Sequence, residues 1–180
     1  MQERFTLKNG QTVLIRRAEE ADAAALAAFF HTCGGETDFL SFGAEDCPFD
    51  EERARQFILG ATGTSALYLA LLDGEIVAEL SLTVPPRKRF YHKLELGIAL
   101  SKSVWRQGLG SRLMELALQH GKEHGIDSIF LTVSAENEAG IALYRRYGFR
   151  EYGRYERQAL INGVYSDALL MNLYLHEQLA

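Results

Sequence analysis

The sequence contains little cysteine, little proline and no excess of positive charge. Its two cysteines, Cys33 and Cys47, have no paired metal-ligand spacing, so we expect reduced thiols rather than a disulfide framework or a metal centre. The net charge of −5 argues against nucleic-acid or anionic-membrane partners, because both favour basic surfaces.

Long apolar runs are also missing. No run approaches the roughly 20 apolar residues that span a bilayer, and the first ten residues lack a basic start followed by an apolar core. We therefore expect a cytoplasmic protein. A hydrophobic content of 47% and a charged content of 24% predict one globular domain over 1–180.

Hydrophobic periodicity and turn signals predict alternating strands and helices. The dipeptides Asp73-Gly74 and Asn162-Gly163 predict two hairpins, the second of them long and terminal. Gly34-Gly35 is expected to end the first helix. The predicted class is α/β (α+β), with a mixed, mostly antiparallel sheet flanked by helices. Strands are expected at 12–17, 66–72, 75–84, 91–100 and 128–133, and helices at 19–31, at 50–60 and from Asn137 to about Gly148.

The most informative stretch is VWRQGLGSRL at 104–113, a two-glycine turn between a predicted strand and a predicted amphipathic helix. A helix start carries backbone N–H groups without internal partners and the positive end of the macrodipole, so it can hold a diphosphate without a basic side chain. Gly108 and Gly110 allow the backbone to approach such a ligand closely. Alone, the turn is equally well explained as a tight strand-to-helix connection.

The segments ELGIALSKSVWRQGLGSRL and LTVSAENEAGIALYRRYGF resemble the acetyl-CoA-binding half of the GNAT superfamily of N-acetyltransferases. The family's phosphate loop reads Gln/Arg-x-x-Gly-x-Gly/Ala, and its glycines fall on Gly108 and Gly110, whereas Trp105 occupies the Gln/Arg position. The resemblance implies a GNAT-type sheet whose splayed parallel strands bind acetyl-CoA. The cofactor-binding positions that it implies are Ile98, Ala99, Leu100, Arg106, Gln107, Gly108, Leu109, Gly110, Ser111, Asn137 and Tyr144.

The resemblance also implies direct acetyl transfer to a primary amine of a small molecule or peptide in a ternary complex, with no metal. Tyr144 is then the general acid that protonates the departing thiolate, and the alternative is a tyrosine that only packs on its helix. Asn137 either caps that helix or faces the cofactor's pantetheine arm, and the two roles are compatible.

Glu95 is the predicted general base, because a carboxylate on a strand face of small residues has room for a substrate amine. A plain surface glutamate is equally compatible with this position. Glu79 on the adjoining strand is the second candidate, and His31 and His92 are weaker ones. Arg112 is expected to be a solvated charge rather than a phosphate ligand.

In relatives of this superfamily the acceptor site is shaped by the first two helices, their connecting loop and the terminal hairpin. The substrate-binding candidates are Phe39, Phe42, Glu79, Tyr165 and Asp167. Two alternatives remain: a protein N-terminal or lysine acetyltransferase, and a non-catalytic acyl-CoA-binding sensor. A homodimer through the terminal hairpin is plausible, because an edge strand of that length is usually covered.

Overall fold

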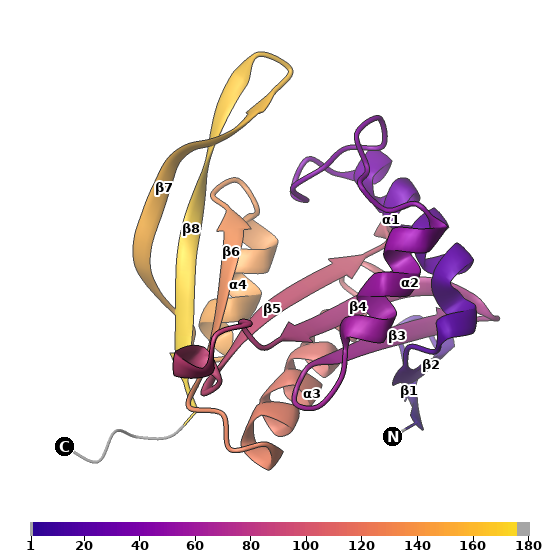
Figure 1. Cartoon of the computed structure of the whole chain (residues 1–180). Coiled ribbons are helices and arrows are strands. Elements are labelled where there is room, and N and C mark those ends of the chain that lie inside the picture. Colours follow the sequence, from indigo (N-terminus) through magenta and orange to yellow (C-terminus); the bar gives the residue numbers. More distant parts are fainter. Residues whose placement is uncertain (1, 176–180) are drawn as a thin grey trace. The chain divides into compact units, whose positions relative to one another are not determined.

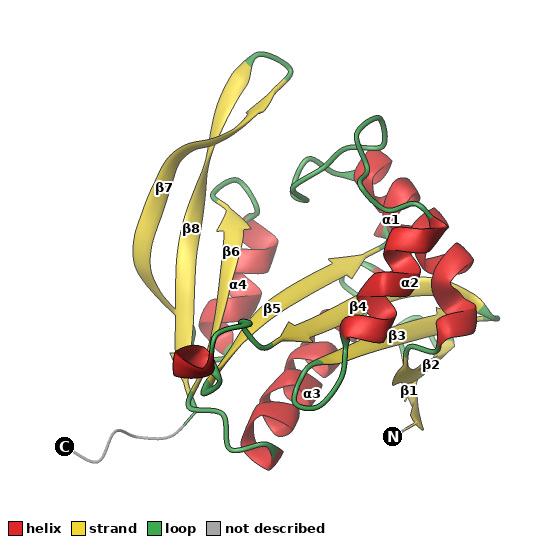
Figure 2. Ribbon diagram, in the orientation of Figure 1, coloured by secondary structure: helices red, strands yellow, loops and turns green. Residues whose placement is uncertain are grey.

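The computed structural model describes residues 2–175 as a mixed, mostly antiparallel sheet flanked by helices (Figures 1 and 2). This confirms the predicted fold class. The hydrogen-bonded strand order is β1-β2-β3-β4-β5-β6-β8-β7. The strands are β1 (Gln2–Thr6), β2 (Thr12–Arg17), β3 (Ala66–Leu72), β4 (Glu75–Thr83), β5 (Lys93–Leu100), β6 (Ser128–Ser134), β7 (Arg150–Ile161) and β8 (Val164–Tyr174). The helices are α1 (Ala23–Glu36), α2 (Glu51–Gly60), α3 (Leu109–Glu123) and α4 (Glu138–Arg146).

Two compact units divide the described chain. The first comprises 2–83 and 97–113, and the second comprises 84–96 and 114–175. The division falls within β5 and within α3, so each of these elements contributes to both units.

The first unit contains antiparallel ladders that join β1 to β2, β2 to β3 and β3 to β4. Asp73 and Gly74 have φ values of 52° and 90°, the positive φ pair of a two-residue hairpin turn, which confirms the predicted hairpin. β1 was not among the predicted strands. Its sequence QERFT is short and mostly polar, and such a strand at the edge of a sheet carries little hydrophobic signal.

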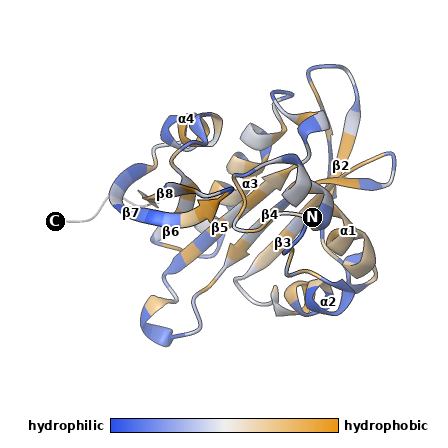
Figure 3. Ribbon diagram, turned by 90° about the horizontal axis from the view of Figure 1, so that it is seen from above, coloured by the Kyte–Doolittle hydropathy of each residue, from blue (hydrophilic) through white to orange (hydrophobic). Residues whose placement is uncertain are grey.

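The core of the first unit lies between β3 and the pair α1 and α2, which cover β3 and β4 in Figure 1. β3 is rich in hydrophobic residues (orange in Figure 3), and its Leu67 and Leu69 are buried in this core. Ser81 and Glu79 of β4 stand opposite these two leucines. Cross-strand partners share a face of the sheet, so both polar side chains point towards α1 and α2.

Helix α1 runs past the glycines that were expected to end it. It continues to Glu36, so the prediction of a stop at Gly34-Gly35 was wrong. A Cβ on Gly34 would lie 2.8 Å from the carbonyl carbon of Gly43, and glycine therefore serves close backbone packing here. In contrast, the predicted start of α2 is confirmed, because the Asp50 carboxylate accepts a hydrogen bond from the N–H of Arg53 at 2.8 Å.

In the second unit, β5 and β6 form a short parallel ladder of three residue pairs, from Lys93 opposite Ser128 to Glu95 opposite Phe130. The other edge of β6 pairs antiparallel with β8, and β7 and β8 form the long hairpin predicted about Asn162-Gly163. The predicted helix after Asn137 is also confirmed as α4. No helix within 2–175 is long and apolar enough to cross a membrane.

Candidate active site

The two-glycine loop joins the end of β5 to the start of α3 within the first unit. Gly108 has a φ of 90°, in the left-handed region that favours glycine. Leu109 is fully buried and fixes the start of the helix, and the N–H of Arg112 donates to the Gly108 carbonyl at 3.2 Å. A helix start of this kind offers backbone N–H donors and a positive dipole end to an anion.

Gln107 fastens this loop to the turn between β1 and β2. Its carbonyl oxygen accepts from the N–H of Lys8 at 3.1 Å, and its Oε1 accepts from the N–H of Asn9 at 3.0 Å. The Gln107 side chain therefore stabilises the loop through its amide oxygen. The sequence did not reveal this anchor, because it depends on the unpredicted β1.

Trp105 replaces the Gln/Arg of the family's loop and forms a local anchor of its own. Its indole N–H donates to the carbonyl oxygen of Leu100 at 2.8 Å, which ties the loop to the last residue of β5. The carboxylate of Glu36 accepts from the N–H of Lys102 at 2.8 Å and fixes the same turn from α1. The side chains of Trp105 and Glu36 therefore both hold this turn through hydrogen bonds to its backbone.

Arg112 forms an ion pair instead of pointing freely into solvent, which corrects the prediction for this side chain. Its Nε and Nη2 donate to the two carboxylate oxygens of Glu3 at 2.8 and 2.6 Å. Both side chains are about one quarter exposed, at 23% and 25%. The bidentate geometry fixes the guanidinium on β1.

The strand face around Gly97 is more crowded than predicted. A Cβ on Gly97 would collide with the hydroxyl oxygen of Ser81, so a larger residue there would displace the Ser81 side chain. Ala99 is 6% exposed and belongs to the core beneath α1 and α2, whereas Ile98 and Leu100 are half-buried. The structure therefore leaves less room along this face of small residues than predicted, because Ser81 lies against Gly97 and Ala99 packs in the core.

Glu79 is the most unusual carboxyl group of the first unit. Its side chain is 3% exposed, and its buried Oε1 has no hydrogen-bond partner among the described residues. Burial raises the pKa of Glu79 to about 8, and a hydrogen bond with Ser81 offsets part of this rise. Burial also raises the pKa of the neighbouring Cys33 thiol to about 11, which argues against a reactive cysteine here.

A cavity of about 170 Å³ lies between the end of α2 and the β3–β4 ladder. It is lined by the side chains of Gln56, Phe57, Ser65, Leu67, Ser81 and Thr83, among others. The sequence did not predict this cavity. Its walls come from α2, from the loop after it and from two strands, and no local pattern links these segments.

In the second unit Tyr144 is 6% exposed and its ring packs against Phe149, with 5.9 Å between the ring centroids. Burial raises the pKa of the Tyr144 phenol well above its usual range, so the group carries its proton at neutral pH. Asn137 accepts from the N–H of Gly140 at 2.9 Å, which confirms its predicted role as helix cap. The cofactor contact of Asn137 stays a prediction.

Glu95, the predicted base, is exposed on β5 opposite Phe130 in the parallel ladder. The side chain of Glu79, in the first unit, is buried instead. Glu95 is open to solvent, and Glu79 is held among apolar side chains beneath two helices.

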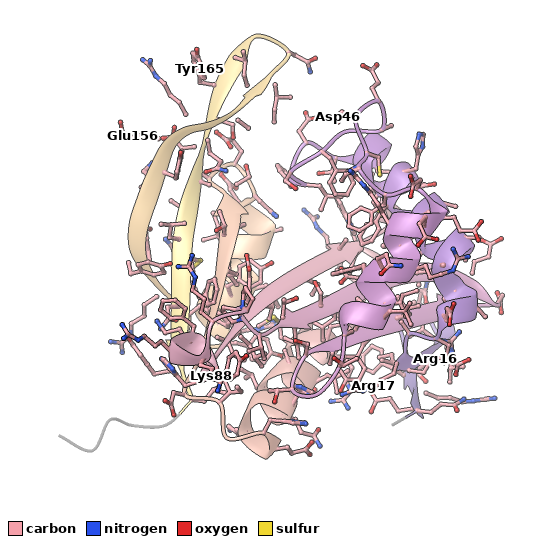
Figure 4. The ribbon with its side chains drawn as sticks, viewed as in Figure 1. Arg16, Arg17, Asp46, Lys88, Glu156 and Tyr165 are labelled. Atoms are coloured by element: carbon pink, nitrogen blue, oxygen red, sulfur yellow. The ribbon has the colours of Figure 1, made fainter. Side chains whose placement is uncertain are left out.

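Two of the predicted acceptor-binding aromatics have different environments. Phe42 packs into a cluster of rings with Phe30 and Phe49, at centroid distances of 5.9 and 6.0 Å. Phe39 is 37% exposed. Phe42 therefore contributes to the packing of the loop between α1 and α2, where Asp46 also lies (Figure 4), and Phe39 alone offers an open ring.

The candidates on the terminal hairpin are Tyr165 and Asp167. Tyr165 lies near the far end of the hairpin (Figure 4), is 57% exposed and has the guanidinium of Arg157 over its ring at 5.1 Å. Asp167 accepts from the N–H of Arg157 at 2.8 Å and from Nε of Arg154 at 2.9 Å. These bonds lower the pKa of Asp167 and hold an irregularity in β7 where Arg157 has a φ of 53°. The role seen for Asp167 is structural.

The fold of the chain agrees with that of known proteins. A sequence model of the acetyltransferase (GNAT) family matches residues 29–149, more than half of the chain. The chain belongs to the GNAT family. Both units contribute residues to this match.

Several individual proteins are also similar to this GNAT chain. An L-amino acid N-acetyltransferase of Escherichia coli (strain K12) is 35% identical over 104 residues, which are 57% of this chain and 64% of that protein. The match thus spans less than two thirds of that relative's length. A GNAT acetyltransferase structure from Streptococcus pneumoniae shares 35% identity and a TM-score of 0.84, covering 91% of this chain and 99% of the other. A Salmonella typhimurium acetyltransferase structure with its cofactor acetyl-CoA shares the fold, at 19% identity, a TM-score of 0.82, and 93% and 96% coverage.

Proposed function

We propose that this GNAT chain is an acetyl-CoA-dependent N-acetyltransferase that acts on a primary amine of a small molecule or peptide. The observation that carries the proposal is the glycine loop between β5 and α3, which is held by Gln107 and Trp105 within a GNAT family match. The amino-acid acetyltransferase from Escherichia coli and the relative solved with acetyl-CoA support the same activity. The family match across both units supports a single domain.

The backbone of 106–111 would bind the diphosphate of acetyl-CoA, since helix-start N–H groups need no basic side chain for this purpose. The backbone of Ile98, Ala99 and Leu100 would bind the cofactor along the end of β5 and polarise the thioester carbonyl. Trp105 supports this role because its bond to the Leu100 carbonyl fixes the end of the strand.

Transfer requires a neutral amine, and the departing thiolate requires a proton. Tyr144 is the proposed acid because it matches the tyrosine of the family's helix pattern, and its phenol carries the proton that the thiolate requires, although burial raises its pKa and makes it a weaker acid than a free phenol. The base is Glu95 or Glu79. Glu95 offers an exposed carboxylate, and Glu79 offers a buried carboxylate that becomes a stronger base once ionised.

The experiment is release of free thiol from acetyl-CoA in the presence of amino acids, amino-acid amides, polyamines, aminoglycosides and short peptides. We expect turnover with one class of amine, and a fall in kcat of about 10²-fold in Tyr144→Phe. The matched control is Tyr152→Phe, because Tyr152 is 61% exposed. If the protein binds acetyl-CoA but releases no thiol with any amine, the result would contradict the proposed enzymatic activity and favour a non-catalytic acyl-CoA-binding sensor.

We also propose a homodimer through the hairpin of β7 and β8. The exposed apolar side chains Leu160, Val164 and Tyr165 near its turn support this association, with exposures of 61%, 68% and 57%. Light scattering should give twice the monomer mass, and Val164→Glu should reduce it. A monomeric mass for the unaltered chain would contradict the dimer.

A further inference from the structure

The buried carboxyl group of Glu79 has an oxygen without a hydrogen-bond partner among the described residues. Buried polar groups are nearly always satisfied, and an unpartnered one is costly to keep. Hydrophobic residues at this position would pack against Leu69 without that cost. Retaining an acid beneath α1 and α2 therefore points to a use for its proton.

Ser81 connects Glu79 to the nearest open space. The two residues lie two positions apart on the same face of β4 and are hydrogen-bonded through their side chains. Ser81 also lines the cavity between α2 and the β3–β4 ladder. A group in that cavity can therefore exchange a proton with Ser81 while Glu79 itself stays out of solvent.

The cavity wall contains no charged side chain among its lining residues. Its polar side-chain groups are the amide of Gln56 and the hydroxyls of Ser65, Ser81 and Thr83, and its other lining side chains are apolar. Its volume of about 170 Å³ corresponds to on the order of six water molecules at about 30 Å³ each. A second ammonium or a carboxylate would lose its hydration there without gaining a counter-charge, so the wall favours a short uncharged group.

We propose that the cavity binds the acceptor as a primary amine on a short uncharged group, and that Ser81 relays the amine's proton to Glu79. This inference rests on the proposed acetyltransferase function. This relay uses the ionised form of Glu79, which predominates only above about pH 8. The ammonium N–H bond breaks and its proton joins the Ser81 oxygen, while the Ser81 hydroxyl proton moves to the Glu79 carboxylate.

The remaining steps also balance. The neutral amine attacks the acetyl carbon, the carbon–sulfur bond breaks, and the thiolate takes a proton from the general acid. The new amide nitrogen still carries an extra proton, which returns to that acid. Glu79 then releases its proton to solvent through Ser81. Ser81 thus contacts the amine, and Glu79 acts through it.

The first test compares Glu79→Gln and Ser81→Ala on two acceptors, n-butylamine and trifluoroethylamine. The first is an ammonium ion at neutral pH, whereas the second is largely neutral. We expect kcat/KM to fall by about 10²-fold for butylamine and by less than about threefold for trifluoroethylamine. Glu75→Gln, at an exposed position of the same strand, should match the unaltered enzyme with both amines.

An equal fall with both amines would overturn the relay, because structural damage does not depend on the protonation of the acceptor. No fall with either amine would also overturn it and leave the acetyltransferase function intact. If the unaltered enzyme acetylates no amine at all, the proposed function fails and the inference fails with it.

The second test concerns the cavity. Gly60 lines it, and a Cβ on Gly60 would meet no atom within 4 Å, so Gly60→Leu can narrow the space without a backbone clash. We expect the KM for butylamine to rise at least about tenfold in this variant and to stay unchanged in Thr62→Leu, at an exposed residue outside the cavity lining. An unchanged KM in Gly60→Leu, or better kcat/KM for spermidine than for butylamine in the unaltered enzyme, would overturn the assignment of the acceptor.

Discussion

Substitution of Glu79 by glutamine is expected to change how the stability of the protein depends on pH. The pKa of Glu79 is about 8 in the folded chain, against 4.5 for an ordinary glutamate. Between these values the folded state holds more protons than the unfolded state, so the free energy of unfolding falls as pH rises. Glutamine stays neutral in both states, so the ionisation at position 79 no longer lowers the free energy of unfolding of Glu79→Gln as pH rises.

The magnitude follows from the two pKa values. Each pH unit between 4.5 and 8 changes the free energy of unfolding by about 1.4 kcal/mol, which gives about 5 kcal/mol over the whole window and about 3 kcal/mol by pH 7. Glu79→Gln should therefore nearly match the unaltered protein at about pH 5 and exceed it by several kcal/mol at about pH 9. The glutamine amide fills a similar volume, so packing changes little.

Urea unfolding at about pH 5, 7 and 9 measures this difference directly. Acids with lowered pKa values, such as Asp22 and Glu136, lose their stabilisation as pH falls, but both proteins contain them and their effect cancels. Glu75→Gln is the exposed control on the same strand. If the difference between Glu79→Gln and the unaltered protein is the same at all three pH values, Glu79 does not ionise as the structure implies.

The remaining predictions concern single contacts. Gly97→Ala should lower the free energy of unfolding by about 1–3 kcal/mol because its Cβ collides with the Ser81 hydroxyl, and a double variant with Ser81→Ala should recover part of that loss in urea titrations. Glu3→Gln should leave the Kd for acetyl-CoA within about twofold in calorimetry, since the carboxylate holds Arg112 on β1; a much larger change would give Arg112 a cofactor role. Cys33 should resist thiol reagents for hours at about pH 8, because the thiol is 1% exposed with a pKa of about 11, and mass spectrometry would reveal any rapid modification.

The elements that could be predicted were those with local causes. The turns at Asp73-Gly74 and Asn162-Gly163 need positive φ values that their residues tolerate, and the caps Asp50 and Asn137 bind N–H groups three residues away. The prediction that the first helix stops at Gly34 was wrong, because the glycine at this position allows close contact with the backbone of Gly43, which lies further along the chain. The strand β1 was missed because its five residues carry almost no apolar pattern.

The sequence by itself determined the family, the order of most strands and helices, and the glycine loop, since these depend on residues that are neighbours along the chain. Only the tertiary structure decided the burial of the two acids considered as bases. Glu79 and Glu95 look alike as strand glutamates, but α1 and α2 bury the first and solvent reaches the second. Desolvation depends on what packs against a side chain in space, and the segments that cover Glu79 are far from it in sequence.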